Sequence, residues 1–475
     1  EDAENLTLEW VGTIPGKRES RRFEGHYMLR QQDVVEQKEF EDAVAFGGWA
    51  LDLHPADGIY SELPSCVQWH SKGVYQIPYR CYVSKDVDNL FFAGRIISAT
   101  HVAFGSTRVM ATSAHGGQAV GMAAVLCTKY SLQPKQILEN NLIRCLQESL
   151  NVTGQSIPGL SFNRKNDLSN SATITASSTI AINEIPFDGE WIPLNESSGQ
   201  LLPFQKNKNH QFTVLVKADK KTMLVTELRV SGKNANYTPD VTLERMELNV
   251  EPGEHYITIN FEKTVPGNQY GFLVILKNKD LFLKCSTHRY TGITSVFNGK
   301  NKAVSNEGKQ SPPPGIGIDT FEFWCPRRRP GGQNIAMKIV PALEPYNAGN
   351  LSNGFTRPYL GTNAWAADLR DIHPQFILKW KEKKQVQTIT LFFDTDYDHP
   401  LESSLWGHKE DIIPFCIREY KILDDTDKVI YHANNNHQTI NKIVLDHAIT
   451  TSAIKIQCRH PAENVPAALF EVIIE

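Results

Sequence analysis

One stretch, residues 89–124, joins an apolar run to a segment built almost entirely from small side chains. Residues 90–93, Leu-Phe-Phe-Ala, predict a short buried strand that ends at Gly94, where the backbone comes close to something large. A polar loop follows, and we expect a helix from about Arg108. The three glycines of this helix each cost about 1 kcal/mol of helix propensity. A helix pressed against a cofactor or another backbone would explain that cost, and so would a ligand-free helix packed tightly on a sheet.

The start of this helix is suited to negative charge. The first N–H groups of a helix lack partners within it, and the helix dipole places partial positive charge at the same end. The side chain of Arg95 or Arg108 could add to that charge. A reduced flavin is negative on its pyrimidine ring, so a helix start aimed at that ring would favour reduction of the flavin.

A second motif, Arg-Glu-Ser-Arg-Arg-Phe-Glu-Gly, occupies residues 18–25. Three further motifs accompany it: Ala-Gly-Arg at 93–95, Ser-Thr-Arg-Val-Met-Ala-Thr at 106–112 and Gly-Gln-Ala-Val-Gly at 117–121. With these motifs, residues 8–160 resemble the C-terminal part of the FAD-dependent oxidoreductase family. The resemblance is to bacterial, often glycan-associated members that join a flavin domain to β-sandwiches.

The resemblance implies a role for each motif residue. The cofactor-binding set would be Gly94, Arg95, Ser106, Arg108, Gly117 and Gln118, and the substrate-binding set Arg18, Arg21 and Arg22. Many flavoproteins with two dinucleotide sites carry Gly-Asp at the strand end, where the aspartate holds the ribityl chain. This chain has Gly94-Arg95 there, which leaves the ribityl contact unassigned.

The glycine-rich phosphate loop of the family is absent from the sequence. A strand–GxGxxG–helix would cradle the FAD pyrophosphate on backbone N–H groups. The segment most similar to this loop is Gly315-Ile316-Gly317, which follows three prolines and precedes no helical pattern. We therefore expect the pyrophosphate site in a missing N-terminal segment, with this chain as the C-terminal portion of a longer flavoprotein.

Two histidines are candidate acid–base groups for moving a proton while a hydride goes to the flavin. His54 follows Leu51-Asp52-Leu53, and His101 opens the segment before the small-residue helix. The ordinary pKa of histidine suits this work. A lone histidine is more often structural, so both remain catalytic hypotheses.

From about residue 172 the sequence pattern becomes one of short β-strands separated by turns. We expect strands at 211–216, 223–230, 255–261, 270–276, 320–324, 376–380, 388–393, 453–458 and 469–474. A helix is expected at 134–150. The polar segment 165–175 and the break near 344–353 predict three domains, at 1–165, 166–343 and 344–475. The expected fold class is α+β and multidomain: part of an FAD-binding α/β domain followed by two antiparallel, jelly-roll-like β-sandwiches.

The last domain is similar to discoidin-like (galactose-binding-like) sandwiches from residue 353 onward. Trp365, Trp406 and Tyr359 could stack on sugars, although in that fold such residues are partly core. The acidic loop 394–398 could hold Ca²⁺, but it lacks the spacing of an EF-hand, and no metal site is expected.

Composition narrows the partners and the location. A net charge of −4 over 475 residues without a dense basic stripe predicts no nucleic-acid partner, and no apolar run is long enough to predict a membrane span. The eight cysteines form no metal-ligand spacing; buried thiols are expected, with one disulfide, Cys285–Cys325, left open. The resemblance implies a periplasmic or extracellular location.

Two functions follow from these patterns. The first is an FAD-dependent oxidoreductase that moves a hydride from a small or carbohydrate-like substrate to the flavin. The second is a non-catalytic carbohydrate-binding or scaffold protein with a degenerate flavin domain. The arginine motif and the small-residue helix favour the first, and the missing phosphate loop favours the second.

Overall fold

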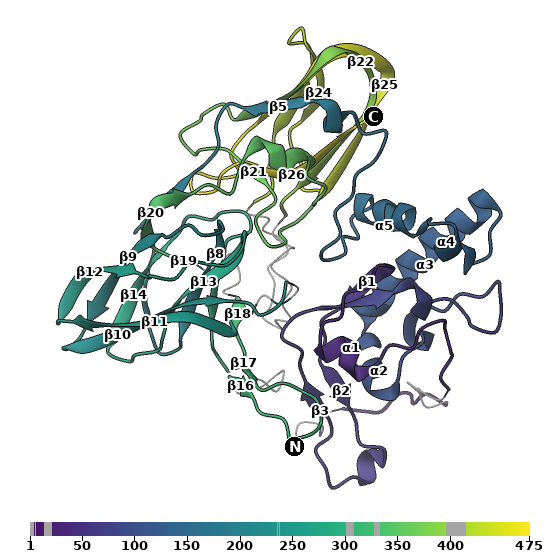
Figure 1. Cartoon of the computed structure of the whole chain (residues 1–475), viewed down its shortest axis with the longest axis horizontal. Coiled ribbons are helices and arrows are strands. Elements are labelled where there is room, and N and C mark those ends of the chain that lie inside the picture. The colour runs from purple at the N-terminus through teal and green to yellow at the C-terminus, as the bar shows by residue number, and fades with distance from the viewer. Residues whose placement is uncertain are drawn as a thin grey trace.

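The structure is a computed structural model that describes residues 4, 6–13, 21–234, 236, 238–300, 308–326, 333–395 and 415–475. Three bodies are visible along the chain (Figure 1): an N-terminal α/β unit, a middle β unit and a C-terminal β unit. The molecule is mostly β-sheet, and its helices gather in the N-terminal unit. The expectation of an α/β region followed by antiparallel β-sheets is confirmed at this level.

The α/β unit is built around small antiparallel strand pairs and one long helix. Its elements are α1 (Gln31–Val35), β1 (Ala43–Gly47), β2 (Leu51–Leu53), η1 (Gly58–Tyr60), β3 (Val67–Trp69), β4 (Tyr75–Pro78), η2 (Tyr79–Cys81), η3 (Gly94–Ile96), α2 (His101–Thr107), α3 (Met110–Tyr130), α4 (Gln136–Glu139) and α5 (Ile143–Val152). β1 pairs with β4 and β2 with β3. The rings of Tyr75, Tyr79 and Tyr82 are buried in the core of the unit, and Tyr82 lies against Gly116 of α3.

Three sequence-based elements of this unit differ from expectation. Residues 90–93 form no strand, because Phe91 makes only an isolated bridge with Val83 and no neighbouring strand extends the pairing. The helix expected from Arg108 begins at Met110, and Arg108 instead ends the preceding helix α2. The helix expected at 134–150 is broken into α4 and α5 at Asn141, whose backbone is left-handed with φ +55°; asparagine tolerates this conformation better than most residues.

Two sheets enclose the core of the middle β unit. The six-stranded sheet has the order β11-β10-β13-β8-β15-β18, and the larger sheet contains β19-β14-β9-β20-β6 with β12 and β7 at its side. Their strands are β6 (Ile182–Ile185), β7 (Trp191–Pro193), β8 (Ser198–Phe204), β9 (Gln211–Ala218), β10 (Thr222–Val230), β11 (Val241–Val250), β12 (Gly253–Asn260), β13 (Gln269–Ile275), β14 (Leu281–Ser286), β15 (Ser295–Phe297), β18 (Cys325–Pro326), β19 (Asn334–Ile335) and β20 (Met337–Leu343). Alternate residues of β9, such as Phe212, Val214 and Val216, point into the shared core, as expected for a half-buried strand.

The C-terminal β unit is organised by two long strands that arc together over its top (Figure 1), β22 (Gln375–Phe393) and β25 (Ile440–Cys458). The sheet also holds β21 (Trp365–Ala366), β23 (Tyr420–Leu423), β24 (Val429–Ala433) and β26 (Ala468–Ile474), with η6 (Ala348–Ser352) beside it. The strands expected at 376–380 and 388–393 are one strand with a register shift at 379–384, because the charged residues between them form a bulge and not a turn. β5 (Thr173–Ala176) completes this sheet by pairing with β22, although it precedes the middle unit in sequence.

A long arm of the middle unit reaches the α/β unit. β16 (Lys309–Gln310) and β17 (Phe321–Glu322) form its base, and the arm runs beside β2 and β3 (Figure 1). The Gln310 side chain accepts from the backbone N–H of His70 at 2.7 Å and donates to its carbonyl at 3.0 Å. Lys72 adds ion pairs with Asp240 at 3.0 Å and Asp319 at 3.4 Å. These contacts fix the arm against the strand pair that carries Asp52.

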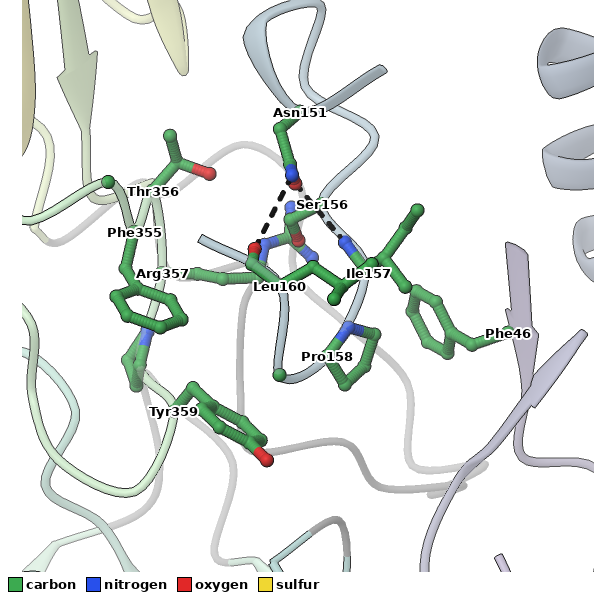
Figure 2. Close-up of a pocket in the computed structure, with 13 residues that line it drawn as sticks. Phe46, Asn151, Ser156, Ile157, Pro158, Leu160, Phe355, Thr356, Arg357 and Tyr359 are labelled. Carbon is green, nitrogen blue, oxygen red and sulfur yellow. Dashed lines mark hydrogen bonds between the residues drawn. The ribbon is translucent and has the colours of Figure 1, made fainter. Parts of the chain in front are cut away.

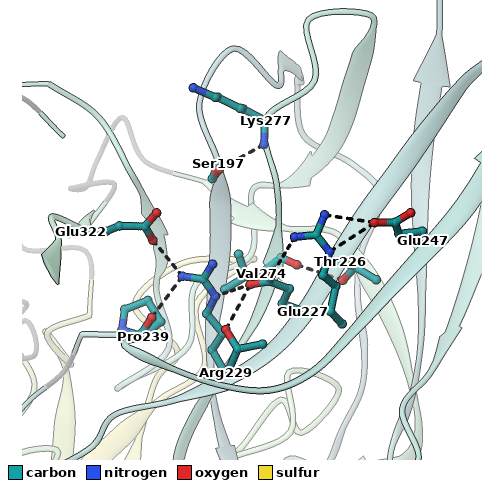
Figure 3. A network of polar contacts seen from close by, with 11 residues as sticks. Ser197, Thr226, Glu227, Arg229, Pro239, Glu247, Val274, Lys277 and Glu322 are labelled. Carbon is teal, nitrogen blue, oxygen red and sulfur yellow. Dashed lines mark hydrogen bonds and ion pairs between the residues drawn. The ribbon is translucent and has the colours of Figure 1, made fainter. Parts of the chain in front are cut away.

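A buried charge network lies on the outer face of the six-stranded sheet (Figure 3). Glu227 is only 4% exposed, and Arg229 donates to it at 2.5 Å. Arg229 also donates to Glu322 at 3.0 Å and lies over the Trp324 ring. The arginine thus ties the base of the arm to the sheet, and its removal would leave Glu227 desolvated and poorly paired.

Other structural expectations concern membranes and cysteines. Within the described ranges, no helix has the length and apolarity required to cross a membrane. The eight cysteines, all among the described residues, form no disulfide, so the bond considered between Cys285 and Cys325 is absent.

Candidate functional site

The corner between α2 and α3 brings several predicted site residues into one region. The Thr100 hydroxyl caps α2 by accepting from the N–H of Ala103, and the chain turns at Arg108 and Val109 before α3 begins. The turn η3, which contains Gly94 and Arg95, packs against α3. The predicted cofactor residues are therefore neighbours in space as well as in sequence.

Two faces of this helical corner differ in what surrounds their glycines. A Cβ on Gly105 would lie 2.9 Å from the Asp52 carbonyl, and one on Gly116 would lie 2.5 Å from the Tyr82 ring. On the other face, a Cβ on Gly117 or Gly121 would meet nothing within 4 Å. Close packing inside the unit therefore accounts for Gly105 and Gly116, whereas the open glycines are explained by nothing in the described structure.

Ser106 is directed into the unit and not toward a ligand. It is fully buried, donates to the Trp49 carbonyl at 2.5 Å and lies 2.7 Å from the Tyr75 hydroxyl. Burial raises the pKa of Tyr75, with the Ser106 hydrogen bond acting in the opposite direction, so this phenol stays neutral. Ser106 anchors α2 on the strand pair β1–β4.

Arg108 and His54 meet at Asp52. The Arg108 guanidinium donates to the Asp52 carboxylate at 3.0 Å and to its carbonyl at 3.2 Å. His54 places Nε2 3.5 Å from the same carboxylate, while its Nδ1 lies 2.9 Å from the Ser65 carbonyl. Both ring nitrogens of His54 thus face partners within the protein, an arrangement typical of a structural histidine.

Arg22 and His101, 79 residues apart, lie side by side. Arg22 donates to the Ala99 carbonyl at 2.7 Å, and its second amino group lies 3.4 Å from Nδ1 of His101. The guanidinium also lies over the Phe104 ring at 5.3 Å. Burial lowers the pKa of Arg22 from its ordinary value. One predicted substrate-binding residue and one predicted catalytic residue therefore share a site at the start of α2.

The other predicted residues are more exposed. Arg21 and Arg95 lie at the surface, and Gln118 donates to the Thr153 hydroxyl at 3.1 Å. Gly94 has φ +66°, which favours glycine, and no atom within 4 Å of an added Cβ. Arg18 lies outside the described residues.

The residues at the open face fit a planar cofactor in part. The residue before α3, Val109, makes no side-chain capping hydrogen bond, and Met110 at the start of the helix is 88% exposed. At the same corner the buried hydroxyl of Thr107 has no hydrogen-bond partner among the described residues. The α3 start, Gly94 and Gly117 therefore fit an isoalloxazine edge, whereas Ser106 and Arg108 are committed to the protein interior.

A separate pocket lies where the α/β unit meets the C-terminal β unit (Figure 2). Phe46, the loop 156–160 and the loop 354–359 line it, and the Arg357 side chain extends across it toward Ser156. The His115 ring packs edge-on against Phe46 at 4.8 Å, and burial, aided by the Arg357 charge, lowers the pKa of His115 to about 4. Sequence reasoning missed this place, because its residues are brought together only by contact between the units.

The residues considered for sugar stacking and for metal binding differ in their surroundings. Trp365 has no exposed surface, and its indole donates to the Ser178 carbonyl, so it is a core residue and not a stacking platform. Trp406 and most of the acidic loop 394–398 lie outside the described residues. Tyr359 is half-buried and lines two pockets. Among the described residues there is no cluster of metal-ligating side chains.

Comparison with known proteins gives one family and several distant folds. The structures include the family 32 carbohydrate-binding module of Streptococcus pneumoniae EndoD, at 8% identity over 26% of this chain and 82% of that chain, with a TM-score of 0.21. They also include the family 32 module of C. perfringens NanJ in complex with galactose, at 13% identity over 27% and 85%, with a TM-score of 0.20. These TM-scores are too low to support a functional inference, and no curated protein matches the chain.

The family match covers the α/β unit. Residues 1–150 match the model described as FAD dependent oxidoreductase. This range contains η3, α2, α3 and the Arg22–His101 pair. The match confirms the expected resemblance of the N-terminal region to FAD dependent oxidoreductases.

Proposed function

We propose that residues 1–165 form the C-terminal portion of an FAD-dependent oxidoreductase in which a hydride passes from a small or carbohydrate-like substrate to the flavin. The observation that carries this proposal is the family match over residues 1–150, which includes the helix that leaves its glycine face open. On this proposal the given chain alone is inactive, because the pyrophosphate would be held by an N-terminal segment beyond it.

The open face defines which residues would hold the cofactor. The uncapped N–H groups of α3 and the backbone at Gly94 and Gly117 would contact the ring, with Arg95 at its edge. FAD would supply the hydride acceptor. The protein would supply the positive end of α3, which favours the anionic reduced form. Ser106 and Arg108 would act as positioning residues that hold α2 and its corner on the strands beneath.

The exposed apolar surface of the α/β unit supports a missing segment. Trp10, Tyr60 and Leu63 are 78%, 87% and 70% exposed, and Met110 is equally open. Among its described residues the strands of the unit also form two-stranded sheets alone, which are marginally stable without further strands. A larger parallel sheet carrying the phosphate loop would complete the domain and bury apolar side chains of this kind.

The Arg22–His101 pair would handle the substrate oxygen. A guanidinium has no acceptor, so Nδ1 of His101 accepts from Arg22 and a neutral ring carries its proton on Nε2. In this tautomer His101 would donate a hydrogen bond to the substrate oxygen, and Arg22 would attract the negative charge that develops there. The proton that the substrate loses together with the hydride would pass to solvent. Both ring nitrogens of His54 face partners within the protein, as is typical of a structural histidine.

A second candidate function is a non-catalytic carbohydrate-binding or scaffold protein whose flavin domain is degenerate. It is favoured by the inward orientation of Ser106 and Arg108, two of the six residues assigned to the cofactor. We further propose a periplasmic or extracellular location, in line with the glycan-associated bacterial proteins that the sequence resembles. Fractionation of the native host would test this location.

The decisive experiment uses protein from the complete gene and asks whether it retains flavin. We expect a yellow protein that releases FAD on denaturation. Gly117→Leu adds a side chain where the structure leaves open space, so it should abolish flavin retention without lowering the melting temperature of the flavin-free protein. Thr128→Leu, at an exposed position near the far end of α3, is the matched control and should retain flavin. Colourless protein that also refuses added FAD would overturn the proposal and leave the scaffold function.

A further inference from the structure

A second pocket lies between the middle and C-terminal β units, away from the proposed flavin site. Its volume is about 670 Å³, within the range of ligand pockets in proteins. One wall comes from the end of β8 and the turns at 205–208 and 268, and the other from residues 344–363. Because both β units contribute a wall, the pocket exists only when the two are assembled.

Hydrogen bonds from asparagine side chains to the backbone hold the walls of this pocket in place. Asn350 donates to the Pro345 and Ala364 carbonyls at 2.9 and 2.8 Å. Asn363 donates to the carbonyls of Arg357 and Tyr359 at 3.2 and 3.0 Å. Side chains that bond the loop backbone in this way make the pocket largely preformed, which reduces the ordering cost of binding a ligand.

An aromatic pair supplies an apolar surface. The rings of Phe355 and Tyr359 are stacked, with centroids 5.9 Å apart and planes 19° apart, and Figure 2 shows them side by side. Leu360, next in the chain, has φ +57°, a left-handed conformation that is rare for a bulky residue. This strained turn follows the tyrosine directly, and strain of this kind is concentrated at ligand-binding loops.

The rim of the pocket carries three charged side chains. Lys206 and Lys208 are exposed, and within the described part of the chain neither ammonium group forms an ion pair. Glu344, the acid of the pocket, is likewise exposed and forms none. The pocket therefore has a net positive charge, an aromatic surface and several side chains able to bond hydroxyl groups.

We propose that this pocket binds an acidic oligosaccharide, one whose sugar units carry carboxylate groups. The C–H face of a sugar ring packs on an aromatic ring, while its hydroxyls bond amide and carboxylate groups. The two lysines would pair with the carboxylates of the ligand. The inference is independent of the proposed flavin chemistry, since it uses only residues outside the α/β unit.

The test is calorimetric titration of the full chain with a short oligogalacturonate and with a neutral galactan fragment of the same length. We expect the acidic sugar to bind, and the double variant Lys206→Ala/Lys208→Ala to weaken it at least about tenfold, or about 1.4 kcal/mol. Raising the salt concentration should also weaken it. Lys217→Ala/Lys379→Ala, which removes two exposed lysines outside the pocket, is the matched control and should bind as the parent does.

Two further measurements keep the outcome unambiguous. Tyr359→Leu preserves apolar bulk but removes the ring, so it should weaken the binding of oligogalacturonate; an unchanged affinity would contradict the stacking. No binding of oligogalacturonate, equal binding by the double lysine variant, or equal affinity for the neutral fragment would each overturn the proposal. Flavin retention, measured on protein from the complete gene with the same substitutions, should be unchanged in all variants, so a failure here is separable from a failure of the oxidoreductase proposal.

Discussion

Replacing Glu471 with glutamine should stabilise the C-terminal β unit in a manner that depends on pH. Glu471 lies in β26, is 2% exposed, and accepts a hydrogen bond from the N–H of Gly354 at 2.9 Å. Burial raises the pKa of Glu471 well above its usual value, and the nearby Asp167 carboxylate raises it further, although the Gly354 hydrogen bond opposes both. The folded protein therefore holds a proton that the unfolded chain releases near pH 4.3.

The sign and size of the effect follow from proton linkage. Above pH 4.3 the folded state binds more protons than the unfolded state, so stability falls as pH rises until the folded pKa is passed. Each pH unit in this interval costs about 1.4 kcal/mol, which gives at most about 3 to 4 kcal/mol at pH 7 and about 1 kcal/mol at pH 5. Glutamine keeps the acceptor for Gly354 and cannot ionise, so Glu471→Gln removes this cost.

Scanning calorimetry of the full chain at pH 5 and pH 7 measures the difference. A gain of 1 kcal/mol raises the melting temperature of a unit of this size by roughly 3 °C, so the variant should gain several degrees more at pH 7 than at pH 5. Glu463→Gln, an exposed carboxylate in the same unit, should leave both transitions unchanged. An equal shift at both pH values, or a loss of stability at both, would refute the reasoning.

Three other predictions test the packing and the charges described above. On α3, Gly116→Ala should destabilise the chain by about 1 to 3 kcal/mol in urea unfolding, because the added Cβ would lie 2.5 Å from a tyrosine ring. Gly121→Ala should instead stabilise the chain by up to about 1 kcal/mol, because its Cβ meets nothing. A change of the same sign in both variants would contradict this account. His115→Phe should make the free energy of unfolding less dependent on pH between pH 6.5 and 4. In this interval the parent protein loses about 3 kcal/mol of stability, because the pKa of its buried imidazole is about 4. An unchanged pH dependence below pH 6.5 would count against this prediction. Arg229→Met should lower the free energy of unfolding by about 2 to 4 kcal/mol, because it leaves Glu227 poorly paired. Adding Glu227→Gln should recover most of this loss, and strictly additive losses in the double variant would disprove the pairing.

The β-rich part of the fold was predictable because its strands carry strong local signals. β9, β10, β12 and β13 each fall within two residues of their expected bounds, since alternating apolar residues and Pro-Gly turns mark them. The bent strand β22 was not, because a run of charged residues resembles a turn until a neighbouring strand pairs with it. Local sequence predicts the existence of strands better than their continuity.

The candidate site was predictable only at its glycines and motif residues. Spacing alone could not tell Gly116, which faces a tyrosine ring, from Gly117, which faces open space, because the two are adjacent in the chain. The neighbourhood of Arg22 and His101 depends on the bridge between Leu29 and Ala99, a long-range pairing without a local signal. The orientations of Ser106 and Arg108 likewise depend on partners more than fifty residues away.

The pairing of β5 with β22 has a consequence for the order of events on the ribosome. Ala176 is synthesised 200 residues before its partner Phe376, so at ordinary elongation rates it waits about 10 to 40 s for the rest of its sheet. During that interval the whole middle β unit can emerge and fold between the two halves. A nascent chain stalled before residue 376 would therefore carry an unpaired strand, and that strand is a natural point for a chaperone to engage.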